Sequence, residues 1–160
     1  MLKYYGADAA YDLSGKTAII TGGAAGIGHA TAEFFAKKGV HLVLADLNPK
    51  VDEIAKAIAS DAIGVSKDAT KGEDRQAILD AALKAFGQVD ILVNCAGIVA
   101  LEKAELISES DWDKTMNVNL KATFMMAQMM GKYYIDHKVN GCIVNMAAQS
   151  GVIVLDKHVA

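Results

Sequence analysis

"TGGAAGIG", residues Thr21–Gly28, decides the fold of this chain. The stretch follows a short apolar run and precedes a helical pattern, which predicts a strand-to-helix turn. Gly22 would permit the tight turn, Gly26 would leave room for a pyrophosphate beside the backbone, and Gly28 would let the helix pack closely. The free N–H groups of the helix N-terminus would then face the phosphates. The loop predicts dinucleotide binding, although any tight strand–helix turn can use glycine.

An acidic residue follows the next apolar run. Asp46 ends "HLVLAD" (residues 41–46), 18 positions after the last glycine of the loop. A carboxylate there can accept hydrogen bonds from both ribose hydroxyls of adenosine and would repel a 2′-phosphate. Ala25 brings no positive charge to the loop, so we expect NAD rather than NADP. In the alternative, Asp46 caps a helix beginning near Pro49, but Asn48 is better placed for that role.

Short apolar runs alternate with longer helical patterns along the whole chain. The runs lack strict polar alternation, which is typical of parallel strands covered on both faces. The pattern predicts an α/β fold with an open, right-handed parallel sheet. We expect strands at 17–21, 41–46, 62–66, 90–97 and 141–147, and helices at about 26–38, 49–60, 71–86 and 111–137.

Three polar pairs have the spacing of helix starts. An N-cap followed by proline, or a Ser or Thr three residues before an acidic side chain, satisfies the free N–H groups of a first turn. The pairs are Asn48 with Pro49, Thr70 with Glu73, and Ser110 with Asp113.

The helix expected over 111–137 has two apolar faces, whereas a helix on the outside of a sheet needs only one. The second face either meets a neighbouring helix of the same chain or meets another subunit, and the two are compatible. We therefore expect a homodimer or homotetramer. The first face holds Trp112, Met116, Leu120, Phe124 and Ala127, and the second holds Val118, Ala122, Met126, Met129 and Tyr133.

Composition excludes several classes of protein. The 160 residues fit one domain, 1–160, and the net charge of −3 comes with no stripe of Lys and Arg, which argues against nucleic acid as the main partner. No apolar run has the length of a membrane span or signal peptide. Cys95 and Cys142 lie in apolar runs and are expected to be buried reduced thiols, which fits a cytoplasmic protein. The histidines and cysteines have no metal-ligand spacing, so we expect no metal site.

The spacing of the glycines and several later residues, in the same order, resemble the short-chain dehydrogenase/reductase family. Asp68 lies where the family has an acidic residue beside adenine. "NCAG", residues 94–97, resembles the family's Asn-Asn-Ala-Gly, with Cys95 at the second Asn. "NVNL", residues 117–120, carries Asn119 at the position of a catalytic Asn. The resemblance implies that NAD is held by Gly22, Ala24, Ala25, Gly26, Ile27, Gly28, Asp46, Leu47, Asp68, Ala69, Asn94, Ala96 and Gly97.

Each of these matches has a plainer alternative. Asp68 could start a helix with Thr70 as its cap, Asn94 could be a turn residue, and Asn119 could be a satisfied polar residue within a helix. The order and spacing of all of them together favour the resemblance.

The family's Tyr-x-x-x-Lys general acid/base pair has no match after the fifth predicted strand. Ala148 aligns with the family's catalytic Ser, so that Ser is missing unless Ser150, two residues later, fills its role, and the Tyr would fall just beyond Ala160. The resemblance implies that this chain is the N-terminal part of a longer enzyme, with a Rossmann-type doubly wound parallel sheet that is incomplete at its C-terminal side. "YIDHK", residues 134–138, has the spacing, but it precedes the fifth strand and lies roughly 22 Å along the helix from Asn119. We interpret it as a chance match.

The resemblance implies an NAD-dependent oxidoreductase that interconverts a secondary alcohol and a ketone, with the catalytic residues Asn119 and Ser150. The segment 149–152 is similar to members that act on polyols and sugars. The alternative is a non-catalytic dinucleotide-binding or scaffold protein of the same fold, which Ala148 and the missing Tyr favour. The 160 residues alone are expected to be inactive. No Gly-Lys-Ser/Thr loop follows the first strand, which excludes a P-loop enzyme.

Overall fold

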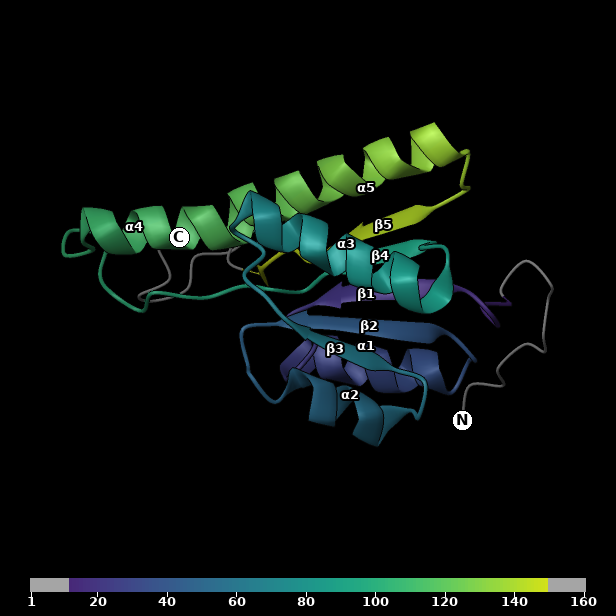
Figure 1. Cartoon of the computed structure of the whole chain (residues 1–160). Helices are drawn as coiled ribbons and strands as arrows, with labels where there is room; N and C mark the ends of the chain where they lie inside the picture. Colours follow the sequence, from purple (N-terminus) through teal and green to yellow (C-terminus); the bar gives the residue numbers. More distant parts are fainter. Residues whose placement is uncertain (1–11, 150–160) are drawn as a thin grey trace.

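The computed structural model of the chain describes residues 12–149 and shows a parallel sheet between two layers of helices (Figure 1). The strand order β3-β2-β1-β4-β5 is that of a doubly wound fold and confirms the prediction. The strands are β1 (Thr17–Thr21), β2 (His41–Asp46), β3 (Ile63–Ser66), β4 (Ile91–Asn94) and β5 (Cys142–Asn145). The helices are α1 (Gly26–Ala36), α2 (Val51–Ile58), α3 (Gly72–Phe86), α4 (Glu109–Met116), a π-helix (Asn117–Ala122) and α5 (Thr123–His137).

The sheet is covered on both faces. Helices α1 and α2 lie on one face, and α3 with the α4–α5 helix lies on the other (Figure 1). Alternate residues of β1 therefore enter different cores: Ile20 packs with the residues of α1 and α2, and Ile19 with those of α3 and α5. All five residues of β1 are buried, which explains why the strand shows no polar alternation.

The long predicted helix is continuous but contains three segments, and it begins two residues earlier than expected, at Glu109. Its second apolar face packs within the same chain: Met126 and Tyr133 are buried beside Ile78 of α3. Its first face remains open, because Leu120 and Phe124 are each 60% exposed. The π-helix in the middle was not predicted from the sequence.

The helix starts predicted from Asn48 and Thr70 are wrong. Asn48 Oδ1 accepts a hydrogen bond from the Lys50 N–H at 2.9 Å, in a turn before α2. Thr70 donates through both its N–H and its Oγ1 to Asp68 Oδ1, at 2.9 and 2.7 Å, and no side chain caps α3. In both places a short polar side chain binds the local backbone of a turn, which competes with helix capping.

The third predicted start is displaced by two residues. Ser108, not Ser110, is the N-cap of α4, and its Oγ accepts a hydrogen bond from the Asp111 N–H at 3.1 Å. The same hydroxyl donates to Asp111 Oδ2 at 2.7 Å, so the cap and the acidic side chain of the first turn bind each other.

The two cysteines differ from the expectation of burial. Cys95 is partly buried, and burial raises the pKa of its thiol, but Cys142 is exposed on β5. Both are free thiols. The correction follows from position, because β5 forms an edge of the described sheet.

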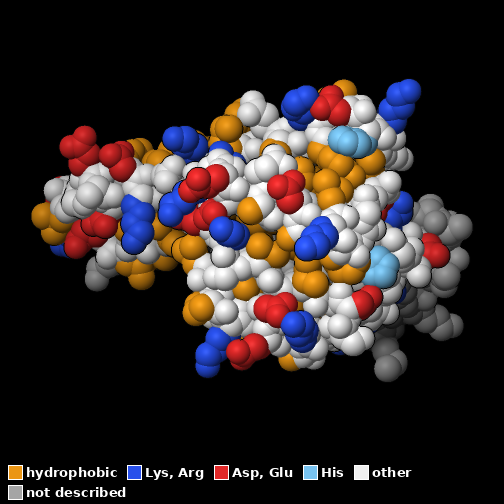
Figure 2. Space-filling model, viewed as in Figure 1, with side chains coloured by type: hydrophobic (Ala, Val, Ile, Leu, Met, Phe, Trp, Pro, Cys, Tyr) orange, Lys and Arg blue, Asp and Glu red, His pale blue; other side chains and the backbone are white. Residues whose placement is uncertain are grey.

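The described part of the chain gives two further results. Between residues 12 and 149, no helix combines the length and apolarity needed to cross a membrane. The same residues contain no group of three His, Cys, Asp or Glu side chains able to hold a metal ion. On the face seen in Figure 2, acidic and basic side chains are interspersed.

Candidate cofactor site

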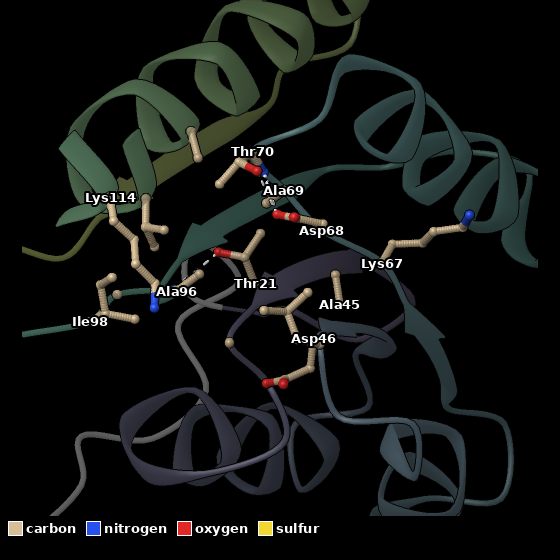
Figure 3. Close-up of a pocket in the computed structure, with 15 residues that line it drawn as sticks. Thr21, Ala45, Asp46, Lys67, Asp68, Ala69, Thr70, Ala96, Ile98 and Lys114 are labelled. Atoms are coloured by element: carbon tan, nitrogen blue, oxygen red, sulfur yellow. Dashed lines mark hydrogen bonds between the residues drawn. The ribbon is translucent and has the colours of Figure 1, made fainter. Parts of the chain in front are cut away.

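A cavity of about 380 Å³ lies at the carboxyl ends of β1, β2, β3 and β4 (Figure 3). Strand β1 pairs with β2 on one side and with β4 on the other. The cavity therefore lies where the strand order reverses. Ligands of open α/β sheets bind at this position. The lining residues are Thr21, Gly22, Ala45, Asp46, Leu47, Lys67, Asp68, Ala69, Thr70, Ala96, Gly97, Ile98, Lys114, Val118 and Ala122.

The three glycines of the loop meet different constraints. Gly22 has φ +67°, and a Cβ there would lie 2.9 Å from Ala96 Cα. A Cβ at Gly28 would collide with the carbonyl oxygen of Gly22, so the start of α1 can approach the loop only without a side chain. Gly26 has φ +56°, but a Cβ there would meet no atom within 4 Å. The loop is therefore packed at its two ends and open at Gly26, directly at the N-terminus of α1.

Asp46 is fixed to this loop by its side chain. Its Oδ2 accepts a hydrogen bond from the Ala24 N–H at 3.0 Å, and its Oδ1 accepts one from the Asn48 N–H at 2.9 Å. A carboxylate has about four acceptor positions, so each oxygen can accept a further hydrogen bond. Asp46 does not cap α2, because that helix begins at Val51 and has no side-chain cap. Leu47, next to it, is 70% exposed at the cavity.

The turn between β3 and α3 forms another wall of the cavity. The Asp68 N–H donates to Asp74 Oδ2 at 3.0 Å, and the Lys67 ammonium binds Asp74 Oδ1 at 3.0 Å. The hydrogen bonds from Asp68 and Lys67 hold the pKa of Asp74 below its ordinary value. Asp68 Oδ1 accepts from Thr70, so one oxygen of Asp68 is occupied within the turn. Asp68 is thus a turn residue beside the cavity, and Thr70 is not a helix cap.

Asn94 connects three elements below the cavity. Its Nδ2 donates to Asn145 Oδ1 at 2.9 Å and to the Thr123 carbonyl at 3.4 Å, which links β4 to β5 and to α5. Asn94 is 3% exposed, and its Oδ1 has no hydrogen-bond partner within residues 12–149. The N–H groups of Cys95 and Ala96 both donate to Thr21 Oγ1 at 3.2 Å, which fixes the start of the loop after β4.

Asn119 lies in the π-helix and reaches the same loop. Its Nδ2 donates to the Ile98 carbonyl at 2.8 Å, and its Oδ1 accepts from the Ile98 N–H at 2.9 Å. The amide is therefore satisfied, as the plainer alternative expected, but by a loop that lines the cavity. Asn119 and the segment Ala96–Ile98 are brought together by this pair of bonds.

The two remaining sequence assignments have different outcomes. Ser150 lies outside the described residues, and Ala148 is exposed after β5. Tyr134 of the "YIDHK" stretch is 8% exposed, and its hydroxyl donates to the Cys142 carbonyl at 3.4 Å. Burial raises the pKa of Tyr134 above its ordinary value. Cys142 begins β5, so Tyr134 lies near the amino ends of the parallel strands, whereas the cavity lies at their carboxyl ends. This position agrees with a chance match.

Eight residues that line the cavity were not among the predicted cofactor-binding residues: Thr21, Ala45, Lys67, Thr70, Ile98, Lys114, Val118 and Ala122. Thr21 ends β1, and its position before the loop was a usable signal. Lys114 lies one helical turn before Val118 of the second apolar face, and this spacing was a usable signal. Lys67 directly precedes Asp68 and carried no signal of its own.

Comparisons with known proteins agree with this geometry. The family model of short chain dehydrogenases matches residues 16–159. The chain is 43% identical over 160 residues to an NAD-dependent glycerol dehydrogenase from Listeria innocua, covering 99% of this chain and 63% of that protein. It is 41% identical over 154 residues to a D-threitol dehydrogenase from Mycolicibacterium smegmatis, covering 94% of this chain and 59% of that protein.

Among solved structures, a short chain dehydrogenase from Bacillus anthracis superposes with a TM-score of 0.86 at 30% sequence identity. That match covers 92% of this chain and 61% of the other. The chain thus spans about six-tenths of the length of these relatives. The matched family model, the strand order and the cavity lead to one conclusion: this chain belongs to the short-chain dehydrogenase family.

Proposed function

We propose that residues 1–160 form a single NAD-binding domain of an oxidoreductase that interconverts a secondary alcohol and a ketone. The observation that carries the proposal is the bond between Asp46 Oδ2 and the Ala24 N–H. It holds the carboxylate that we propose to bind the ribose against the loop whose open side, at Gly26, adjoins the N-terminus of α1. Ribose and pyrophosphate of one dinucleotide can then be held by adjacent groups.

The proposed cofactor is NAD. Asp46 would accept hydrogen bonds from the ribose hydroxyls and repel the 2′-phosphate of NADP, while Asp68 and Ala69 would border the adenine. The loop from Thr21 to Gly28 contains no basic side chain to attract that phosphate. NAD held at these residues would supply the hydride acceptor for the alcohol carbon, and the hydroxyl proton would leave to a base.

The residues of this chain would bind and orient rather than exchange the proton. Asn119 holds the loop Ala96–Ile98 at the cavity, and Ser150 is proposed to orient the substrate oxygen in place of the residue at Ala148. The names of the two relatives, a glycerol dehydrogenase and a D-threitol dehydrogenase, support a polyol as substrate.

A scaffold or nucleotide-binding protein without catalysis is the second candidate. Ala148 favours it, because its methyl group cannot donate a hydrogen bond to a carbonyl. The two candidates differ in turnover and agree in NAD binding.

The test combines cofactor titration with turnover. The longest available form of the protein, rather than residues 1–160 alone, is titrated with NAD and NADP, and then supplied with glycerol, threitol and related polyols while reduced nicotinamide is followed by absorbance. We expect preference for NAD, loss of that preference in Asp46→Ala, and oxidation of at least one polyol. Equal affinity for both nucleotides before and after the substitution would refute the assignment of Asp46. NAD binding without any turnover would favour the scaffold.

We also propose a cytoplasmic homodimer or homotetramer that uses the exposed face of α4 and α5. Trp112 is 43% exposed, and Leu120 and Phe124 are 60% exposed, so these side chains form an apolar surface along one helix. Burial of such side chains typically stabilises association. Light scattering over a wide concentration range would show a single monomer if the proposal is wrong.

A further inference from the structure

Lys67 lies beside the proposed ribose site. Its backbone N–H donates to the Asp46 carbonyl at 3.0 Å, and the residue is one of those that line the cavity, together with Asp46 and Leu47. A lysine ammonium on a flexible four-carbon stem is a general phosphate-binding group. A 2′-phosphate on the ribose would therefore enter next to a potential cationic partner.

The ammonium of Lys67 is directed elsewhere. Figure 3 shows its side chain turned away from Asp46 and from the cavity. Its Nζ lies 3.0 Å from Asp74 Oδ1, and the Asp74 side chain is only 15% exposed. The other oxygen of Asp74 accepts the Asp68 N–H at 3.0 Å, so the carboxylate is anchored to the turn that it faces.

We propose that Asp74 is a specificity-determining residue, which withholds the Lys67 ammonium from the 2′-phosphate of NADP. The inference rests on the proposed NAD-binding function. Discrimination against NADP then has two parts: Asp46 repels the phosphate, and Asp74 holds a cation of the cavity wall that could compensate. Asp74, like any carboxylate of ordinary pKa, is charged at neutral pH, and its hydrogen bonds with Asp68 and Lys67 lower the pKa further, so the pair persists under ordinary conditions.

Two other lysines lie near this region but occupy different places. Lys71 contributes positive potential at Asp74, but it is not among the cavity residues. Lys114 lines the cavity from α4, across from the turn that carries Asp68. Lys67 alone combines a cavity position with a bond to Asp74, which makes it the group that neutralisation of Asp74 would release.

The first test is a titration of NAD and NADP into the protein and its variants. Asp74→Asn keeps the shape and can still accept the Asp68 N–H, but it no longer holds the ammonium by charge. We expect NADP affinity relative to NAD to rise about fivefold, as for one exposed ion pair. Asp74→Glu should keep the wild-type ratio, and Lys71→Met serves as the matched control. The double variant Lys67→Met/Asp74→Asn should lose the gain.

An unchanged ratio in Asp74→Asn, or a gain that survives in the double variant, would overturn the inference. A second test does not depend on the folding of any Asp74 variant. In an Asp46→Ala background, Lys67→Met should change NADP affinity by less than about twofold, because Asp74 already holds the ammonium. A loss of NADP affinity well beyond that would show that Lys67 is free to bind the phosphate, contrary to the inference.

These outcomes are separable from failure of the proposed function. A wild-type protein that binds neither nucleotide overturns the proposed function and this inference with it. A wild-type protein that prefers NAD, with Asp74→Asn unchanged in its ratio, overturns the inference alone.

Discussion

Asn119 binds both backbone polar groups of Ile98 with one side-chain amide. The Nδ2 donates to the Ile98 carbonyl at 2.8 Å, and the Oδ1 accepts the Ile98 N–H at 2.9 Å. Asn119 lies in the π-helix between α4 and α5, and Ile98 follows β4. The helix and the cavity loop are far apart in the chain, so this two-point contact sets their relative position.

We expect substitution of Asn119 to weaken NAD binding by releasing the loop. Asn119→Asp keeps the acceptor but loses the bond to the Ile98 carbonyl, whereas Asn119→Ala loses both bonds and should be the more harmful substitution. Each lost hydrogen bond should cost about 1 kcal/mol in the free energy of unfolding, and NAD affinity should fall with it. Urea denaturation and NAD titration measure both effects. Asn117→Ala, in the same π-helix, is the control, and an equal loss there would contradict a specific role for Asn119.

Substitution of Gly28 should lower the stability of the fold, whereas substitution of Gly26 should mainly prevent NAD binding. Gly28→Ala should destabilise the fold by about 1–3 kcal/mol, because the new methyl group collides with the Gly22 carbonyl. Gly26→Ala should cost only about 1 kcal/mol from its positive φ, since the space around it is open, but should abolish NAD binding by filling that space. Thermal unfolding and NAD titration separate the two. Tight NAD binding by Gly26→Ala would place the pyrophosphate elsewhere.

The sequence predicted the sheet and the loop because both depend on local patterns. The run of apolar residues in β1 and the following glycines determine a buried strand and a turn, whatever the rest of the chain does. The helix starts predicted at Asn48 and Thr70 were wrong, because capping depends on which backbone group each side chain reaches. In these two turns, the side chains of Asp46 and Asp68 accept hydrogen bonds from the backbone N–H groups of Asn48 and Thr70. The Lys67–Asp74 pair could not be predicted, since seven positions across a turn give no fixed geometry.

Asp90 should make stability depend on acidic pH. Its carboxylate is 6% exposed and accepts hydrogen bonds from the Thr17 N–H at 3.0 Å, the Lys16 ammonium at 3.1 Å and the Gln88 amide at 2.8 Å. Burial alone would raise the pKa of Asp90, but these donors outweigh it and lower the pKa below the ordinary value. Asp90 therefore stabilises the fold above its unfolded pKa of about 3.9, and this contribution is lost as pH falls through the lower folded pKa.

The variant Asp90→Asn tests this dependence. It should lower the free energy of unfolding by about 1–3 kcal/mol at neutral pH, and its stability should change less than that of the wild type below about pH 5. Urea denaturation at a series of pH values measures both. Asp136→Asn removes an exposed pair with Lys132 and should change stability by less than about 1 kcal/mol. Parallel pH profiles for wild type and Asp90→Asn would refute the assignment.

The last prediction concerns the missing hydroxyl at Ala148. Ala148 follows β5 and is exposed, at the position where the family has its catalytic Ser. If no other residue supplies the hydrogen bond to the substrate carbonyl, Ala148→Ser should raise kcat toward the 10²- to 10³-fold effect, roughly, of one such donor. If Ser150 supplies it, Ser150→Ala should abolish activity and Ala148→Ser should change little. Steady-state kinetics with a polyol and NAD distinguish these outcomes through kcat. The KM for NAD should stay constant in both. Within residues 12–149, no Tyr-x-x-x-Lys pair lies at the cavity, and loss of such a general acid/base typically costs roughly 10²- to 10⁴-fold. Rapid polyol oxidation by residues 1–160 alone would therefore show that the proton is exchanged by a group other than the expected Tyr.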